Sequence, residues 1–86
     1  MQLTKGIEKF LRAVKTGSKE TIILSSEDCK AIKTQFGGSY NFLDFIEKES
    51  GTVHTDIQEP SLFADDNQTI KITFLNGAEI ELRMVL

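Results

Sequence analysis

The clearest pattern of hydrophobic and polar positions lies in residues 68–86, where two alternating runs flank an Asn-Gly pair at 76–77. Alternation is typical of half-buried strands, and Asn-Gly between two such runs predicts a β-hairpin. A two-residue turn would put the apolar side chains of the two runs on opposite faces of the sheet, whereas a three-residue loop puts them on one face. We therefore predict a loop of residues 75–77, with Gly77 in the left-handed conformation that favours glycine.

The charges of the two runs support this loop. A loop at 75–77 places Lys71 opposite Glu81, whereas a loop at 76–78 would place Lys71 opposite Arg83. Opposite charges across an antiparallel pair are favourable, and like charges are not. The predicted register gives the hairpin one apolar face, made of Ile70, Ile72, Phe74, Ile80, Leu82 and Met84.

The start of the chain has helical spacing. Apolar residues between positions 3 and 14 recur three and four residues apart, which predicts a helix from about Lys5 to Thr16. Thr4 is the predicted N-cap of this helix, and Gly17 is its predicted stop. Residues 20–24 follow with β-branched, contiguous apolar side chains, which favour a strand in the interior of a sheet.

Two further helices are predicted before the next strand. Ser25 and Asp28 have the spacing of a capping box, and the glycines at 37–38 end the helix that this box begins. Ser39 is the predicted N-cap of a third helix that stops at Gly51. The third helix carries five large apolar side chains within seven residues. It therefore either sits between other elements or exposes aromatic surface.

The remaining segments complete an α+β pattern. Residues 52–57 alternate as a strand, and residues 58–67 form a loop longer than most connections. The predicted order is α-β-α-α-β-β-β, in one domain of 86 residues. Helices grouped early and strands grouped late predict one mostly antiparallel sheet with the helices packed on one face and a C-terminal β-hairpin.

Composition removes several classes of protein from consideration. Charged residues make up 27% and hydrophobic residues 40% of the chain, which is typical of an ordinary globular domain. The longest wholly apolar run is the three residues 22–24, which predicts no membrane-spanning helix. A single cysteine excludes an internal disulfide and favours a reducing, cytoplasmic location.

Few residues are candidates for chemistry. Cys29 falls on the apolar stripe of its predicted helix, which favours core packing over a catalytic thiolate. His54 is the only histidine, so a transition-metal site lacks a second soft ligand. The sequence contains no Gly-rich phosphate loop between a strand and a helix. We therefore predict that the chain is not an enzyme and uses no catalytic residue, metal or cofactor.

Charge is distributed unevenly along the chain. Residues 1–19 carry a net charge of +4, and residues 44–66 carry −6. Within the acidic segment, Leu62 and Phe63 resemble an apolar hot-spot anchor in a charged rim, although they would alternatively fold back over the sheet. We predict that this segment binds a protein partner with a basic or mixed surface. The predicted contact residues are Asp44, Glu47, Asp56, Glu59, Leu62, Phe63, Asp65 and Asp66.

These patterns lead to two hypotheses about function. The first is a small non-catalytic protein-binding module that acts as a regulator, accessory subunit or inhibitor, by analogy with small proteins of mobile elements. The second is binding of nucleic acid or an anionic small ligand by the basic side of the first helix, through Lys5, Lys9, Arg12 and Lys15. A homo-oligomer would form if the strand of Ile22 or the C-terminal strand lay at a sheet edge.

Overall fold

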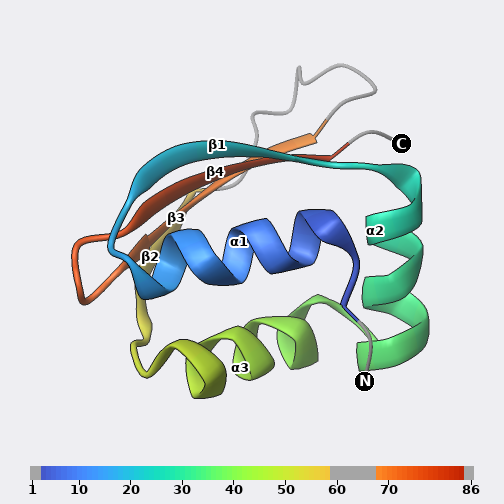
Figure 1. The fold of residues 1–86 in the computed structure, drawn as a ribbon, viewed down its shortest axis with the longest axis horizontal. Helices are drawn as coiled ribbons and strands as arrows, with labels where there is room; N and C mark the ends of the chain where they lie inside the picture. Colours follow the sequence, from blue (N-terminus) through green and yellow to red (C-terminus); the bar gives the residue numbers. More distant parts are fainter. Residues whose placement is uncertain (1–2, 59–67, 85–86) are drawn as a thin grey trace.

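The computed structural model describes residues 3–58 and 68–84 of the chain. Figure 1 shows a sheet with the helices on one side of it, so the predicted α+β class is confirmed. The elements are α1 (Lys5–Lys15), β1 (Lys19–Leu24), α2 (Ser26–Ala31), the π-helical segment η1 (Ile32–Phe36), α3 (Ser39–Ser50), β2 (His54–Gln58), β3 (Gln68–Phe74) and β4 (Glu79–Met84). Their order and the C-terminal β3–β4 hairpin agree with the prediction. Part of the predicted loop, residues 59–67, lies outside the described residues.

The four strands lie in the order β1-β4-β3-β2. The pairs β2–β3 and β3–β4 are antiparallel, and β1 pairs with β4 in parallel. The prediction that residues 20–24 form an interior strand is therefore wrong, because β1 lies at an edge. Ile22 and Leu24 point into the core, whereas the intervening Ile23 is 61% exposed on the other face. The contiguous apolar residues thus reflect one exposed isoleucine and not a strand that is covered on both faces.

The hairpin has the predicted register. Ile72 lies opposite Ile80 and Ile70 opposite Leu82. The Gly77 N–H donates to the Phe74 carbonyl at 3.0 Å, and Gly77 has a φ of 98°, as expected for the glycine of a three-residue loop.

One predicted charge contact of the hairpin is replaced by another. Lys71 does lie opposite Glu81 in the register, but its ammonium group lies 3.5 Å from a carboxylate oxygen of Glu79. Glu81 instead contacts Arg83 at 3.6 Å. Long side chains on an exposed sheet face reach diagonal neighbours, so the facing residue does not fix the ion pair.

Both ends of α1 are capped as predicted. The Thr4 hydroxyl accepts a hydrogen bond from the Ile7 N–H at 3.4 Å. At the C-terminus the N–H groups of Gly17 and Ser18 donate to the carbonyls of Val14 and Ala13, which is the Schellman arrangement. Gly17 has a φ of 67°, so a glycine is favoured at this position.

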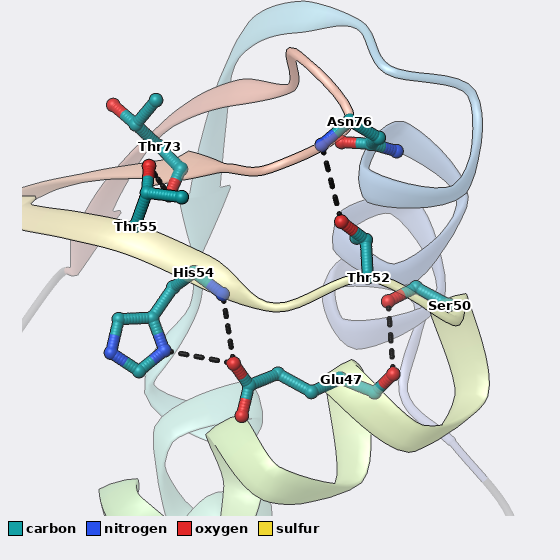
Figure 2. Close-up of polar contacts among 7 residues, drawn as sticks. All are labelled: Glu47, Ser50, Thr52, His54, Thr55, Thr73 and Asn76. Atoms are coloured by element: carbon teal, nitrogen blue, oxygen red, sulfur yellow. Dashed lines mark hydrogen bonds and ion pairs between the residues drawn. The ribbon is translucent and has the colours of Figure 1, made fainter.

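Asn76 in the hairpin loop ties three parts of the fold together. Its side-chain amide donates to the Val14 carbonyl in the last turn of α1 at 2.8 Å. Its Oδ1 accepts from the Ala78 N–H at 3.1 Å, and its backbone N–H donates to the Thr52 hydroxyl at 3.2 Å. The asparagine that predicts the turn therefore also fixes the hairpin to α1. Figure 2 shows its second contact, to Thr52 in the connection before β2.

Asp28 joins the N-terminal ends of α1 and α2. Its carboxylate accepts from the Ser25 N–H at 2.8 Å, and the Ser25 hydroxyl accepts from the Asp28 N–H, so the predicted capping box is present. The Thr4 hydroxyl and the Gly6 N–H lie beside the same carboxylate and help to lower its pKa. A Cβ on Gly6 would lie 2.7 Å from the Asp28 carboxyl carbon, so glycine permits the close approach of the two helices.

The second and third helices differ from the prediction in detail. The helix that begins at the capping box changes to π-helix at Ile32 before it ends at Gly37. Ser39 is not the N-cap of α3, because the chain is already helical there and Gly38 holds the cap position without a side-chain hydrogen bond. The stop at Gly51 is as predicted. Tyr40 is 87% exposed, so α3 does expose an aromatic side chain.

The core lies between the sheet and the helices, with α1 in contact with β1, β4 and α3. Successive ring contacts at centroid distances of 5.0–6.3 Å link the sheet to the helices. The rings in this chain of contacts are Phe74, Phe10, Phe42, Phe36 and Phe45. The apolar hairpin face packs here as predicted, with Ile72, Phe74, Ile80 and Leu82 buried and Ile70 and Met84 partly buried.

Candidate functional site

The acidic segment is described over its first half. Asp44 is exposed on α3, and Asp56 is exposed on β2. Neither carboxylate forms an ion pair with another described residue, although Asp56 accepts a long hydrogen bond from the Gln58 amide at 3.5 Å. Both side chains are therefore accessible to a partner.

Glu47 has a different position from these two aspartates. One of its carboxylate oxygens accepts from the His54 N–H at 2.8 Å and lies 2.9 Å from Nδ1 of the same histidine (Figure 2). These contacts join the last turns of α3 to the first residue of β2. Glu47 is half-buried, so its main observed role is to hold β2 in place.

β2 is the second edge of the sheet, and its pairing with β3 is irregular. His54 lies opposite Phe74 and Asp56 opposite Thr73, so Thr55 is an extra residue in β2. The Thr55 hydroxyl donates to the Thr73 carbonyl at 3.3 Å. The strand predicted at residues 52–57 is present as β2, and all five of its residues are exposed. A bulge at an edge accommodates a strand that contributes no buried side chain.

The other predicted contact residues cannot be placed. Glu59, Leu62, Phe63, Asp65 and Asp66 lie outside the described residues. Their contact with a partner, and the alternative in which Leu62 and Phe63 cover the sheet, both stay predictions.

The basic residues of the first helix lie on its solvent side. Lys5, Lys9, Arg12 and Lys15 are all exposed on α1, as the helical spacing predicts. None of them forms an ion pair with another described residue. Two of them, Lys9 and Arg12, also line a groove that runs between α1 and β1.

This groove is the site that sequence reasoning missed. It has a volume of about 510 Å³. Besides Lys9 and Arg12, its lining consists of Ala13 of α1, Thr16 and Ser18 in the connection that follows, and residues 20–23 of β1. In Figure 1, α1 runs beneath β1 along most of the strand. The groove is open because β1 is an edge strand, with no described strand beyond it. A strand predicted in the interior of the sheet gives no reason to expect such a groove.

Cys29 is partly buried against the core, as its place on the apolar stripe predicts. Burial raises the pKa of the Cys29 thiol, and the neighbouring Asp28 carboxylate raises it further, while Lys33 opposes both effects. A thiol with a raised pKa holds its proton and is a poor nucleophile. Among residues 3–58 and 68–84, no three His, Cys, Asp or Glu side chains are grouped so as to hold a metal ion.

Comparisons with protein families, curated proteins and solved structures find no match to this chain. No helix in the described part of the chain is long and apolar enough to cross a membrane. Function is therefore inferred from the residues of the chain itself.

Proposed function

We propose that the chain is a small non-catalytic protein-binding module that acts as a regulator, accessory subunit or inhibitor. Its docking surface is the acidic segment 44–66, and its partner has a basic or mixed surface. The observation that carries this proposal is the pair of exposed aspartates, Asp44 and Asp56, on two elements that Glu47 and His54 hold together. Carboxylates on a fixed frame lose little freedom when they bind.

The acidic segment has the composition of a docking surface. Exposed charges steer a partner of opposite sign and set the orientation of the complex. Directly after β2, the sequence supplies Leu62 and Phe63, the large apolar side chains that an interface needs for affinity. A chain of this size acts by covering a partner's surface and requires no deep cleft of its own.

The test is the affinity for a partner captured on the immobilised full chain and then purified. We expect the double variant Asp44→Lys/Asp56→Lys and the single variant Phe63→Ala each to raise the Kd by about tenfold or more. Glu27→Lys is the matched control, because Glu27 is an exposed acidic residue outside the segment. If the double variant and Phe63→Ala both bind as tightly as the Glu27→Lys control, the segment is not the docking surface.

Binding of an anion by α1 is a second candidate function. It is favoured by the exposed, unpaired positions of Lys5, Lys9, Arg12 and Lys15 among the described residues. A labelled single-stranded oligonucleotide is a suitable probe, since phosphate contacts make affinity fall steeply with salt. Lys9→Glu/Arg12→Glu should abolish such binding. Absence of binding at about 50 mM salt would reject this candidate.

A further inference from the structure

The outer edge of β1 presents a regular row of backbone hydrogen-bonding groups. Its register with β4 continues without a shift from Lys19 to Leu24. The Glu79 N–H donates to the Ser18 carbonyl at 3.0 Å, which sets the direction of the groups that follow. Because these directions alternate along a strand, Glu20, Ile22 and Leu24 face β4. The N–H and C=O groups of Lys19, Thr21 and Ile23 therefore point away from the sheet, and no described strand pairs with them.

The surroundings of this edge differ above and below the plane of the sheet. On the side of the helices lies the groove lined by Lys9 and Arg12, and Glu20 is the one acidic residue among the described residues that line it. On the opposite side, Ile23 exposes 61% of its surface. A strand added at this edge would alternate its own side chains between the basic groove and the opposite face, where Ile23 lies in register with Arg83 of β4.

We propose that the β1 edge binds an extended segment of another protein by β-strand addition. The segment alternates acidic and apolar residues, with carboxylates towards Lys9 and Arg12 and apolar side chains beside Ile23. Backbone hydrogen bonds to Lys19, Thr21 and Ile23 supply affinity, and the two faces supply specificity. Six residues of β1 span about 20 Å, which sets the length of the recognised segment at roughly six residues.

The charges disfavour a second copy of this chain as the occupant. In a symmetric dimer through β1, each copy presents the same surface, so Lys9 and Arg12 of both copies would lie at one interface. A head-to-tail contact would instead need the β2 edge, where the bulge at Thr55 interrupts the backbone row. A separate acidic segment meets neither obstacle.

This inference goes beyond the proposed function, since it concerns a second docking surface at the opposite edge of the sheet. Substitutions at Thr21, Lys9 and Arg12 leave Asp44 and Asp56 unchanged. Loss of binding at the β1 edge is therefore measured independently of loss of binding at the acidic segment.

The test is an NMR titration of the full chain with the peptide acetyl-(Glu-Val)4-amide. We expect saturable shifts at residues 19–23, together with slower amide exchange at Lys19, Thr21 and Ile23. The matched peptide acetyl-(Lys-Val)4-amide should bind at least about tenfold more weakly, because it brings like charges to the groove. The acidic peptide N-methylated at every residue should not bind, because it cannot donate to the edge.

Two variants of Thr21 test the same edge from the side of the protein. Thr21→Pro removes an N–H that forms no bond within the sheet, so the fold keeps its hydrogen bonds and the added strand loses one. Thr21→Val keeps the N–H and is the control. We expect at least about tenfold weaker peptide binding for Thr21→Pro and little change for Thr21→Val.

Several outcomes would overturn the proposal. They are absence of peptide binding, shifts centred on β2, and equal binding of the N-methylated peptide, which would indicate simple anion binding by α1. Slow exchange at Thr21 that depends on protein concentration, without peptide, would instead identify a second copy as the occupant. If Thr21→Pro does not fold, the N-methylated peptide still decides the role of the backbone.

Discussion

The two edges of the sheet are built differently. β1 follows β4 without interruption and supplies Ile22 and Leu24 to the core. β2 supplies no buried side chain, and its register shifts by one residue at Thr55. Both strands are short edges of one sheet, so the difference comes from what each contributes to packing.

An edge strand that contributes to the core has little freedom to bend. A bulge in β1 would turn either Ile22 or Leu24 out of the core, because side chains alternate between faces. β2 carries no such constraint, and its bulge interrupts the row of groups on which another strand would pair. The regular edge is therefore the one suited to accept a strand, and the bulged edge is suited to present acidic side chains.

Truncation of one side chain in each edge strand gives the largest expected difference. Leu24→Ala should lower the free energy of unfolding by about 2–5 kcal/mol, because Leu24 is fully buried. Ile57→Ala in β2 should cost less than about 1 kcal/mol, since Ile57 is 38% exposed. Urea denaturation measures both values. Equal losses would contradict the view that, of the two edge strands, only β1 contributes to the core.

The next largest difference in stability is expected between the removal of two carboxylates, that of Asp28 in α2 and that of Glu47 in α3. Asp28, in the first turn of α2, is 6% exposed and forms the capping box with Ser25, so Asp28→Ala should cost about 1–2 kcal/mol. Glu47→Ala removes contacts to His54 at the exposed start of β2 and should cost about 0.5–1 kcal/mol. Thermal unfolding of both variants checks this order. A larger loss for Glu47→Ala would reverse it.

The effect of Asp28 should depend on pH. Burial raises the pKa of its carboxyl, but hydrogen bonds from Thr4, Ser25 and Gly6 outweigh this and hold the pKa below the ordinary value of 3.8. The unfolded chain then binds the proton more readily than the folded chain. The stabilisation is therefore complete above the ordinary pKa and is lost as the pH falls through the lower folded value. Stability measured against pH should decline less in acid for Asp28→Asn than for the unchanged protein. An unaltered acid decline would contradict this.

The smallest expected difference concerns the hairpin loop, which contacts α1 through the Asn76 side chain and Thr52 through the Asn76 N–H. Asn76→Ala removes the half-buried hydrogen bond to α1 together with the one that the side chain accepts from the Ala78 N–H, and should cost about 1 kcal/mol. Thr52→Val removes an exposed hydrogen bond on the β2 side and should cost less than about 0.5 kcal/mol. Chemical denaturation at two or more protein concentrations resolves both changes. Equal costs would show that the loop is held by the β2 side as strongly as by α1.

Local patterns predict much of this fold. The hairpin register follows from alternation and from the charges of Lys71, Glu81 and Arg83, and the caps of α1 follow from Thr4 and Gly17. Each of these features depends on residues close together in the sequence or directly opposite in a hairpin. The strand order does not, because the place of β1 beside β4 is decided by packing between distant segments.

The candidate sites show the same limit. Helical spacing correctly places Lys9 and Arg12 on the solvent side of α1, but the groove they share with β1 requires knowledge that β1 is an edge. The sequence predicts Glu47 as a free acidic residue. In the structure the turn at Gly51 places His54 next to the Glu47 carboxylate. The contact of Asp28 with Gly6 spans 22 positions, and the unusual glycine in a first helical turn is its only signal in the sequence.

Amide hydrogen exchange of the free chain tests most directly whether β1 is an open, regular edge. The N–H groups of Glu20, Ile22 and Leu24 should exchange at least about 100-fold more slowly than those of Lys19, Thr21 and Ile23, because only the first set faces β4. Residue-by-residue NMR at low protein concentration measures this alternation. Slow exchange at Thr21 and Ile23 would show that the edge is already covered and would contradict the open edge.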